Sequence, residues 1–120
     1  MFLLFAIVFI LTGIVIRIFS HSLHDFSNPN RKTFTGYLRR KTNFDLHHIH
    51  LGAILFLFTL MGYFFFGINR LIIILFAISI SLIVDQIIPL IFRGIDYFKL
   101  QGVLASILMH CLVLILVFIL

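Results

Sequence analysis

Histidine and aspartate, the residue types best suited to metal binding and proton transfer, are clustered in this sequence. One cluster consists of His21, His24 and Asp25, and a second consists of Asp45, His47, His48 and His50. Imidazole nitrogen and carboxylate oxygen are common ligands of zinc, iron and manganese. Residues three apart share one face of a helix, so both clusters have the spacing of paired metal ligands.

Asp85 is the third chemical feature, because it lies in the otherwise apolar stretch 71–92. An ionisable side chain inside a membrane span costs about 2.5–3.5 kcal/mol even on lenient scales, so it requires a partner. Pro89 follows four residues later and cannot donate a hydrogen bond to the Asp85 carbonyl, which leaves that oxygen available. We expect Asp85 to be buried beside a histidine or a basic residue, and the alternative to a metal is a structural pair with Arg17 or Arg93.

These clusters together predict a metal site of divalent zinc, iron or manganese. Its ligands would be His24, His48, His50 and Asp85. Asp25 or Asp45 would orient a ligand histidine or act as a catalytic base, as outer carboxylates do around metals. Arg39, Arg40 and Lys41 would bind an anionic lipid headgroup.

The elements that position these residues must be membrane spans. The 120 residues are 62% hydrophobic and 11% charged, whereas soluble domains contain about 25% charged residues. Four stretches approach the length of about 20 residues that a transmembrane helix needs, at residues 1–19, 46–67, 71–92 and 97–120. The sequence therefore predicts an all-α membrane protein, with four transmembrane helices in a small bundle that forms one integral membrane domain over residues 1–120.

The second span carries a stripe of small residues that continues the face of Asp45 and His48. Gly52, Thr59 and Gly62 make up this stripe. Small residues allow helix backbones to approach closely in membranes. We therefore expect this stripe to pack against another helix.

The orientation follows from the basic residues, because loops rich in lysine and arginine remain in the cytoplasm. Eight of the nine basic residues fall on one side of the four-span topology, and only Arg70 falls on the other. Both termini are therefore expected outside a cell (inner) membrane, with the basic loop 20–45 inside.

Residues 31–41 of that loop have the pattern of a short interfacial helix, and an irregular basic loop is the alternative. The expected partners are membrane lipids, and a homo-oligomer or larger membrane complex, rather than nucleic acid.

His110 lies about halfway along the fourth span, in a stripe of small and polar residues with Gly102, Ala105 and Ser106. A buried histidine that hydrogen-bonds to a neighbouring helix is the favoured interpretation. A haem ligand or a member of a proton relay is the alternative.

The histidine spacings partly resemble the histidine boxes of membrane fatty-acid desaturases and hydroxylases, which hold a di-iron site on the cytoplasmic side. Those boxes are His-x-x-x-His and His-x-x-His-His, whereas this chain has His21-x-x-His24 and His47-His48-x-His50. The chain is also shorter and has fewer histidines, so membership is not assigned.

The residues and the predicted spans are compatible with three functions. The first is a membrane protein with a metal site at the cytoplasmic interface, including a metal-dependent enzyme that acts on a lipid or lipid-linked substrate. The second is a non-enzymatic membrane subunit, or a carrier of ions or protons, with a structural network of histidine and aspartate. The third is a haem-binding bundle.

Overall fold

The structure, a computed structural model, describes residues 1–26, 48–91 and 99–120; the side chains of residues 20–26, 48 and 88–91 lie outside this description. The helices are α1 (Phe2–Phe26), α3 (His48–Phe66), α4 (Arg70–Ile91) and α5 (Leu100–Ile119). Each of these four contains a stretch long and apolar enough to cross a membrane. Over the described residues, the prediction of helical structure with four helices able to span a membrane is thus confirmed, and it is consistent with a multi-pass membrane protein.

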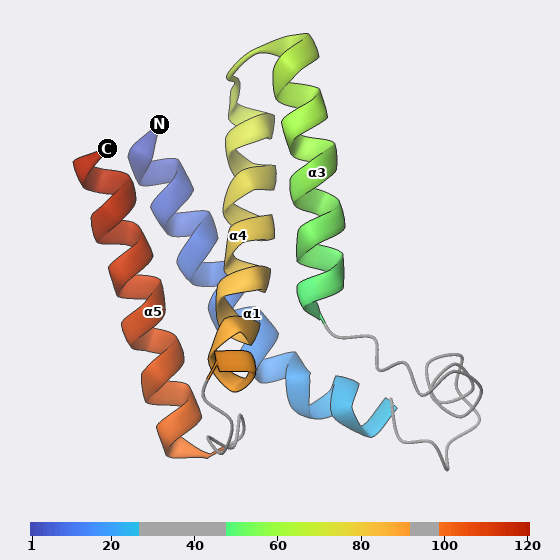
Figure 1. Cartoon of the computed structure of the whole chain (residues 1–120), viewed down its shortest axis with the longest axis vertical. Coiled ribbons are helices and arrows are strands. Elements are labelled where there is room, and N and C mark those ends of the chain that lie inside the picture. Colours follow the sequence, from blue (N-terminus) through green and yellow to red (C-terminus); the bar gives the residue numbers. More distant parts are fainter. Residues whose placement is uncertain (27–47, 92–98) are drawn as a thin grey trace.

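Helix α4 occupies the centre of the arrangement, since it packs against each of the other three helices. Helix α1 crosses α4 obliquely and also packs against α5, whereas α3 lies on another side of α4 (Figure 1). The two termini and the turn between α3 and α4 lie toward the upper end in that view. The end of α1 and the beginning of α3 and α5 lie toward the other end, together with the end of α4.

Local sequence features account for three helix boundaries. Helix α1 continues to Phe26, seven residues past the predicted end of the first span, because no glycine or proline interrupts the sequence before Pro29. At the other end of the molecule, Gly67 adopts a positive φ of 64° and ends α3, as glycine commonly does at this position. The Asn69 side chain then accepts a hydrogen bond from the Ile72 amide at 3.0 Å and caps α4.

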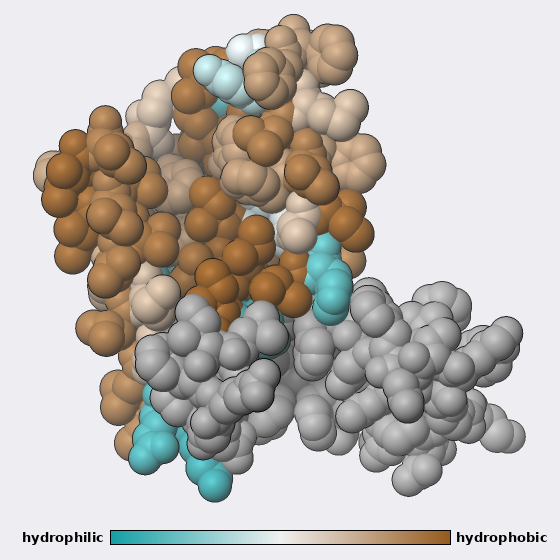
Figure 2. All heavy atoms as spheres, in the orientation of Figure 1, coloured by the Kyte–Doolittle hydropathy of each residue, from teal (hydrophilic) through white to brown (hydrophobic). Residues whose placement is uncertain are grey.

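The apolar core lies between α1, α4 and α5. Its buried members are Phe5, Phe9, Ile73, Ala77 and Val84. Large apolar side chains nevertheless remain exposed along α1, α3 and α5, and at Leu71 in the first turn of α4, and the described surface in Figure 2 is mostly hydrophobic. A surface of this kind is suited to contact with lipid rather than with water.

The stripe of small residues on α3 packs against α4, as predicted. Gly52 and Thr59 are buried, and a methyl group at Gly52 would lie 2.8 Å from the Leu82 Cβ and 3.0 Å from the Ser79 carbonyl oxygen. A methyl group at Gly62 would lie 3.0 Å from Ile72. The Thr59 hydroxyl donates to the Leu55 carbonyl at 2.7 Å, so it needs no partner on α4. The close approach of α3 to α4 therefore depends on the absence of larger side chains.

We expect Gly52→Leu to separate α3 from α4 and to lower the stability of the folded protein in detergent by about 1–3 kcal/mol, the usual cost of overpacking. Ala53→Leu is the matched control, because Ala53 is the next residue and is exposed. Thermal unfolding in the same detergent measures both variants. Equal stability of the two variants would contradict this packing.

Candidate functional site

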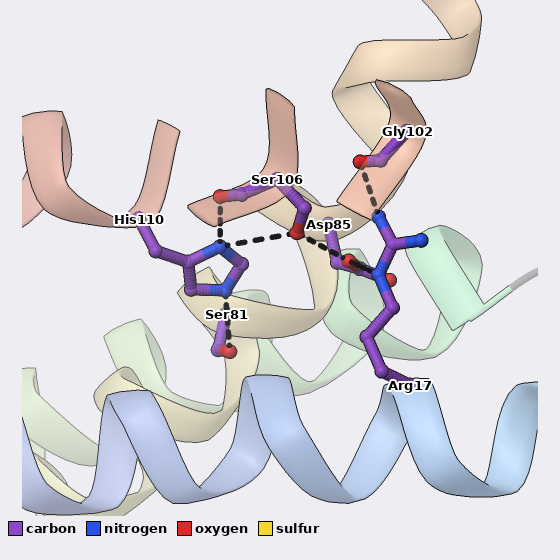
Figure 3. Close-up of polar contacts among 6 residues, drawn as sticks. All are labelled: Arg17, Ser81, Asp85, Gly102, Ser106 and His110. Carbon is purple, nitrogen blue, oxygen red and sulfur yellow. Dashed lines mark hydrogen bonds and ion pairs between the residues drawn. The ribbon is translucent and has the colours of Figure 1, made fainter. Parts of the chain in front are cut away.

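Three helices face one another through residues spaced four apart. The stripe on α1 is Phe5, Phe9, Gly13 and Arg17; that on α4 is Ile73, Ala77, Ser81 and Asp85; that on α5 is Gly102, Ser106 and His110. A spacing of four keeps side chains on one helix face. The stripes of α1 and α4 are apolar at one end and polar at the other, and the polar halves meet between the helices (Figure 3).

An ion pair joins α1 to α4. Arg17 Nε donates to Asp85 Oδ1 at 2.8 Å, and the two residues are 68 positions apart in the sequence. The Asp85 side chain is fully buried and that of Arg17 is 17% exposed. Arg17 also donates through a terminal nitrogen to the Gly102 carbonyl at 3.1 Å, so the same guanidinium contacts α5. Arg17 therefore connects all three helices and neutralises the buried carboxylate.

Ser106 extends this pair toward the middle of α5. Its hydroxyl donates to Asp85 Oδ1 at 2.7 Å and lies 3.4 Å from His110 Nδ1. The same His110 nitrogen is 2.8 Å from the Ser106 carbonyl oxygen. At the opposite side of the ring, His110 Nε2 lies 3.1 Å from the Ser81 hydroxyl. The result is a continuous polar network, defined here as Arg17, Asp85, Ser106, His110 and Ser81 (Figure 3).

The partners of His110 determine its tautomer. A carbonyl oxygen only accepts hydrogen bonds, so Nδ1 must carry the proton that it shares with Ser106. In a neutral ring, Nε2 is then the acceptor and the Ser81 hydroxyl donates to it. The network thus contains one unprotonated ring nitrogen, buried between α1, α4 and α5.

Helix α1 holds the imidazole ring in place. The Phe9 ring centroid lies 4.8 Å from that of His110, and a methyl group at Gly13 would lie only 2.9 Å from His110 Nε2. Phe5 stacks on Phe9 with 5.5 Å between centroids. Toward the chain termini the network is therefore closed by aromatic rings, and in the other direction it leads to the partly exposed Arg17.

Two sequence predictions about single residues are confirmed. Asp85 is buried beside a basic residue, and this residue is Arg17. His110 is 9% exposed and hydrogen-bonds to Ser81 of a neighbouring helix. The proposed haem ligation does not fit this geometry, because both ring nitrogens have protein partners and α1 lies directly over Nε2.

The predicted metal ligands are only partly described. His24 and Asp25 lie in the last turn of α1 and His48 begins α3, but their side chains lie outside the described set; His50, in the first turn of α3, is half-buried. Asp45, Arg39, Arg40 and Lys41, and the predicted interfacial helix 31–41, also lie outside the described residues. Among the side chains that are described, no group of three or more histidine, cysteine or acidic residues has the arrangement of a metal site.

Sequence reasoning did not identify Gly13 or the role of Ser81. Each lies four residues before a member of the ion pair, Gly13 before Arg17 and Ser81 before Asp85. That shared spacing, matched by Gly102, Ser106 and His110 on α5, is the pattern that indicates one polar layer across three helices.

Comparison with protein-family models, curated proteins and solved structures finds no match. The polar network itself is therefore the feature from which a function can be inferred.

We expect Arg17→Met to destabilise the protein, because it leaves the Asp85 carboxylate buried without its cation. Breaking a buried pair costs about 3–5 kcal/mol, and the partial exposure of Arg17 places the expected loss at or below the lower end of this range. The double variant Arg17→Met with Asp85→Leu should recover most of the loss, since no buried charge remains.

Unfolding in detergent at pH 8, above the usual titration range of imidazole, measures this double-mutant cycle. Arg70→Met is the control, because Arg70 is exposed at the first residue of α4. Additive losses in the double variant would show that the two side chains do not stabilise the fold as a pair.

Proposed function

We propose that this chain is a non-enzymatic membrane protein that binds and carries protons through Asp85, Ser106, His110 and Ser81 of the polar network, with Arg17 as the counter-ion at its partly exposed end. The observation that carries the proposal is the continuity of the network from the partly exposed Arg17 to the buried Ser81. Intramembrane ionisable residues that face a helix interior commonly form proton relays. Each of Asp85, Ser106, His110 and Ser81 can accept or release a proton, directly or by rotation of a hydroxyl.

Burial supports proton transfer over reactions with larger substrates. Ser81 and Asp85 are fully buried, and Ser106 and His110 are nearly so. Among the described side chains, no buried nitrogen or oxygen lacks a hydrogen-bond partner. A proton can enter such a network by exchange along hydrogen bonds, whereas a larger substrate requires the helices to separate. The closed aromatic end formed by Phe5 and Phe9 supports a carrier in an occluded state over an open channel.

A metal site at the end of α1 and the beginning of α3 is the second candidate function. Its support is the placement of the backbone: Gly52 packs against Leu82 and Ile83, and Arg17 pairs with Asp85. These contacts bring the helix ends that carry His24, His48 and His50 toward the same end of α4. Asp85 already accepts one hydrogen bond from its ion-pair partner Arg17 and one from Ser106, so the histidines are the better ligands.

In this second function, a bound zinc, iron or manganese ion would supply Lewis-acid or redox chemistry. Asp25 or Asp45 would orient a ligand or act as a base. Arg39, Arg40 and Lys41 would hold the headgroup of a lipid substrate.

For either function we infer a location in a cell (inner) membrane with both termini outside, on the basis of the distribution of basic residues. The exposed apolar faces of α1, α3 and α5 support membrane lipids as the surrounding partner. The polar network would then exchange protons with the cytoplasmic side, where Arg17 lies in this topology.

We expect the purified protein in liposomes to accelerate proton entry when a membrane potential is applied, as reported by an enclosed pH-sensitive dye. Asp85→Asn and Ser106→Ala should reduce the rate to that of protein-free liposomes, because each interrupts the hydrogen-bonded path. Cys111→Ala should behave like the wild type, since Cys111 is exposed and outside the network. A wild-type rate equal to that of protein-free liposomes would refute the carrier function.

For the second candidate, we expect metal analysis of the detergent-purified protein to find zinc, iron or manganese in stoichiometric amount. His48→Ala should abolish binding and His110→Ala should retain it, because His110 belongs to the polar network. Metal content that is unchanged in His48→Ala, or lost in His110→Ala, would contradict this site.

A further inference from the structure

His110 Nε2 is the one position in the polar network where an additional proton can bind to a nitrogen. The Ser106 carbonyl fixes a proton on Nδ1, and guanidinium nitrogens of Arg17 do not lose or gain protons in proteins. At Nε2 the partner is the Ser81 hydroxyl, which can donate or accept by rotation. A proton on Nε2 therefore keeps its hydrogen bond to Ser81 with the direction reversed, and the ring becomes an imidazolium.

Within the described part of the chain, the charges near this ring come from α1 and α4. Among the described residues, the charged or titratable groups that face His110 are Asp85 from α4 and, through it, Arg17 from α1. Lys99, which precedes α5, and Cys111 on α5 are exposed. Helix α3 packs on a different side of α4, around Leu82 and Ile83. Asp85 is thus the counter-ion for both Arg17 and a protonated His110.

Ser106 couples these two cations to the one carboxylate. Its hydroxyl bonds to Asp85 Oδ1 at 2.7 Å and lies 3.4 Å from His110 Nδ1. With Arg17 paired and His110 neutral, the network carries no net charge. A proton on His110 adds one positive charge, which is costly within a membrane span.

The positions of the two cations decide which of them can leave. Phe9 and Gly13 hold the His110 ring in place. Arg17 is partly exposed and lies two residues before the end of the apolar part of α1, Phe2–Phe19. A long arginine side chain in such a position can extend to the lipid headgroups. Arg17 is therefore the cation that can move when the second positive charge appears.

We propose that His110 is the proton-binding residue of this protein, and that a proton on His110 competes with Arg17 for the Asp85 carboxylate. Proton binding then exchanges one counter-ion of Asp85 for another, and releases the contacts of Arg17 with α4 and α5. This inference deepens the proposed carrier function, since it names the residue that holds the proton and the contacts that proton binding releases.

The test is the protonation of His110 in protein with 15N-labelled histidine, measured by NMR in bilayers at pH 6. The ring signals of His110 are assigned by their loss in His110→Gln. Arg17→Gln removes the competing cation, and we expect the ratio of imidazolium to neutral His110 to rise about tenfold or more, the scale of a nearby charge. Arg17→Lys, which keeps the cation, should remain close to the wild type.

Asp85→Asn supplies a variant with the opposite expected result, so the test does not depend on the folding of Arg17→Gln. It removes the counter-ion, and the imidazolium ratio should fall about tenfold. Ser106→Ala combined with Arg17→Gln should show a smaller rise than Arg17→Gln alone, because the connecting hydroxyl is absent. An unchanged His110 ratio in Arg17→Gln or in Asp85→Asn would overturn the proposal.

This measurement is independent of the liposome assay. A protein whose His110 responds as expected but which carries no protons across liposomes would refute the carrier function and retain the competition for Asp85. A protein that transports protons while its His110 ratio is insensitive to Arg17 and Asp85 would retain the carrier function and refute the competition for Asp85.

Discussion

The buried charge of Asp85 is the constraint on which the arrangement of α1, α4 and α5 depends. A carboxylate in an apolar span must be compensated within the protein, because lipid offers neither counter-ions nor hydrogen bonds. Arg17 provides the charge and Ser106 provides a hydroxyl donor, both on the same oxygen. Since Arg17 also reaches the Gly102 carbonyl, satisfying one side chain fixes the relative rotation of three helices.

Helix α4 meets these neighbours with two chemically different faces. Toward α1 and α5 it presents Ser81 and Asp85, whose partners are polar side chains. Toward α3 it presents the aliphatic Leu82 and Ile83 and a backbone carbonyl, against glycine. Apolar helices gain little by avoiding lipid, so close backbone contact on one face and hydrogen bonds on the other are the two means available for association.

The length and hydropathy of the spans could be predicted from the sequence, because a bilayer sets both. The need of Asp85 for a partner and the packing of Gly52 and Thr59 followed from the same reasoning. The choice of Arg17 could not be made, since it depends on how far α1 is displaced along α4. Nor could the connection between Asp85 and His110, which were expected at different depths; Ser106, one turn before His110, bridges them. Such offsets arise from packing of whole helices rather than from any local pattern.

The separation of 68 residues between Arg17 and Asp85 has a consequence for synthesis of the chain. At about 5–20 residues per second, roughly 3–14 s pass between translation of the arginine and translation of the aspartate. During this interval Asp85 is not yet present to pair with Arg17. An arginine near the end of a span can instead place its charge among the lipid headgroups. The aspartate, which is too short to do so from its position in α4, is made second. The order of the two charges along the gene thus lets the more costly one enter a membrane in which its counter-ion is already present.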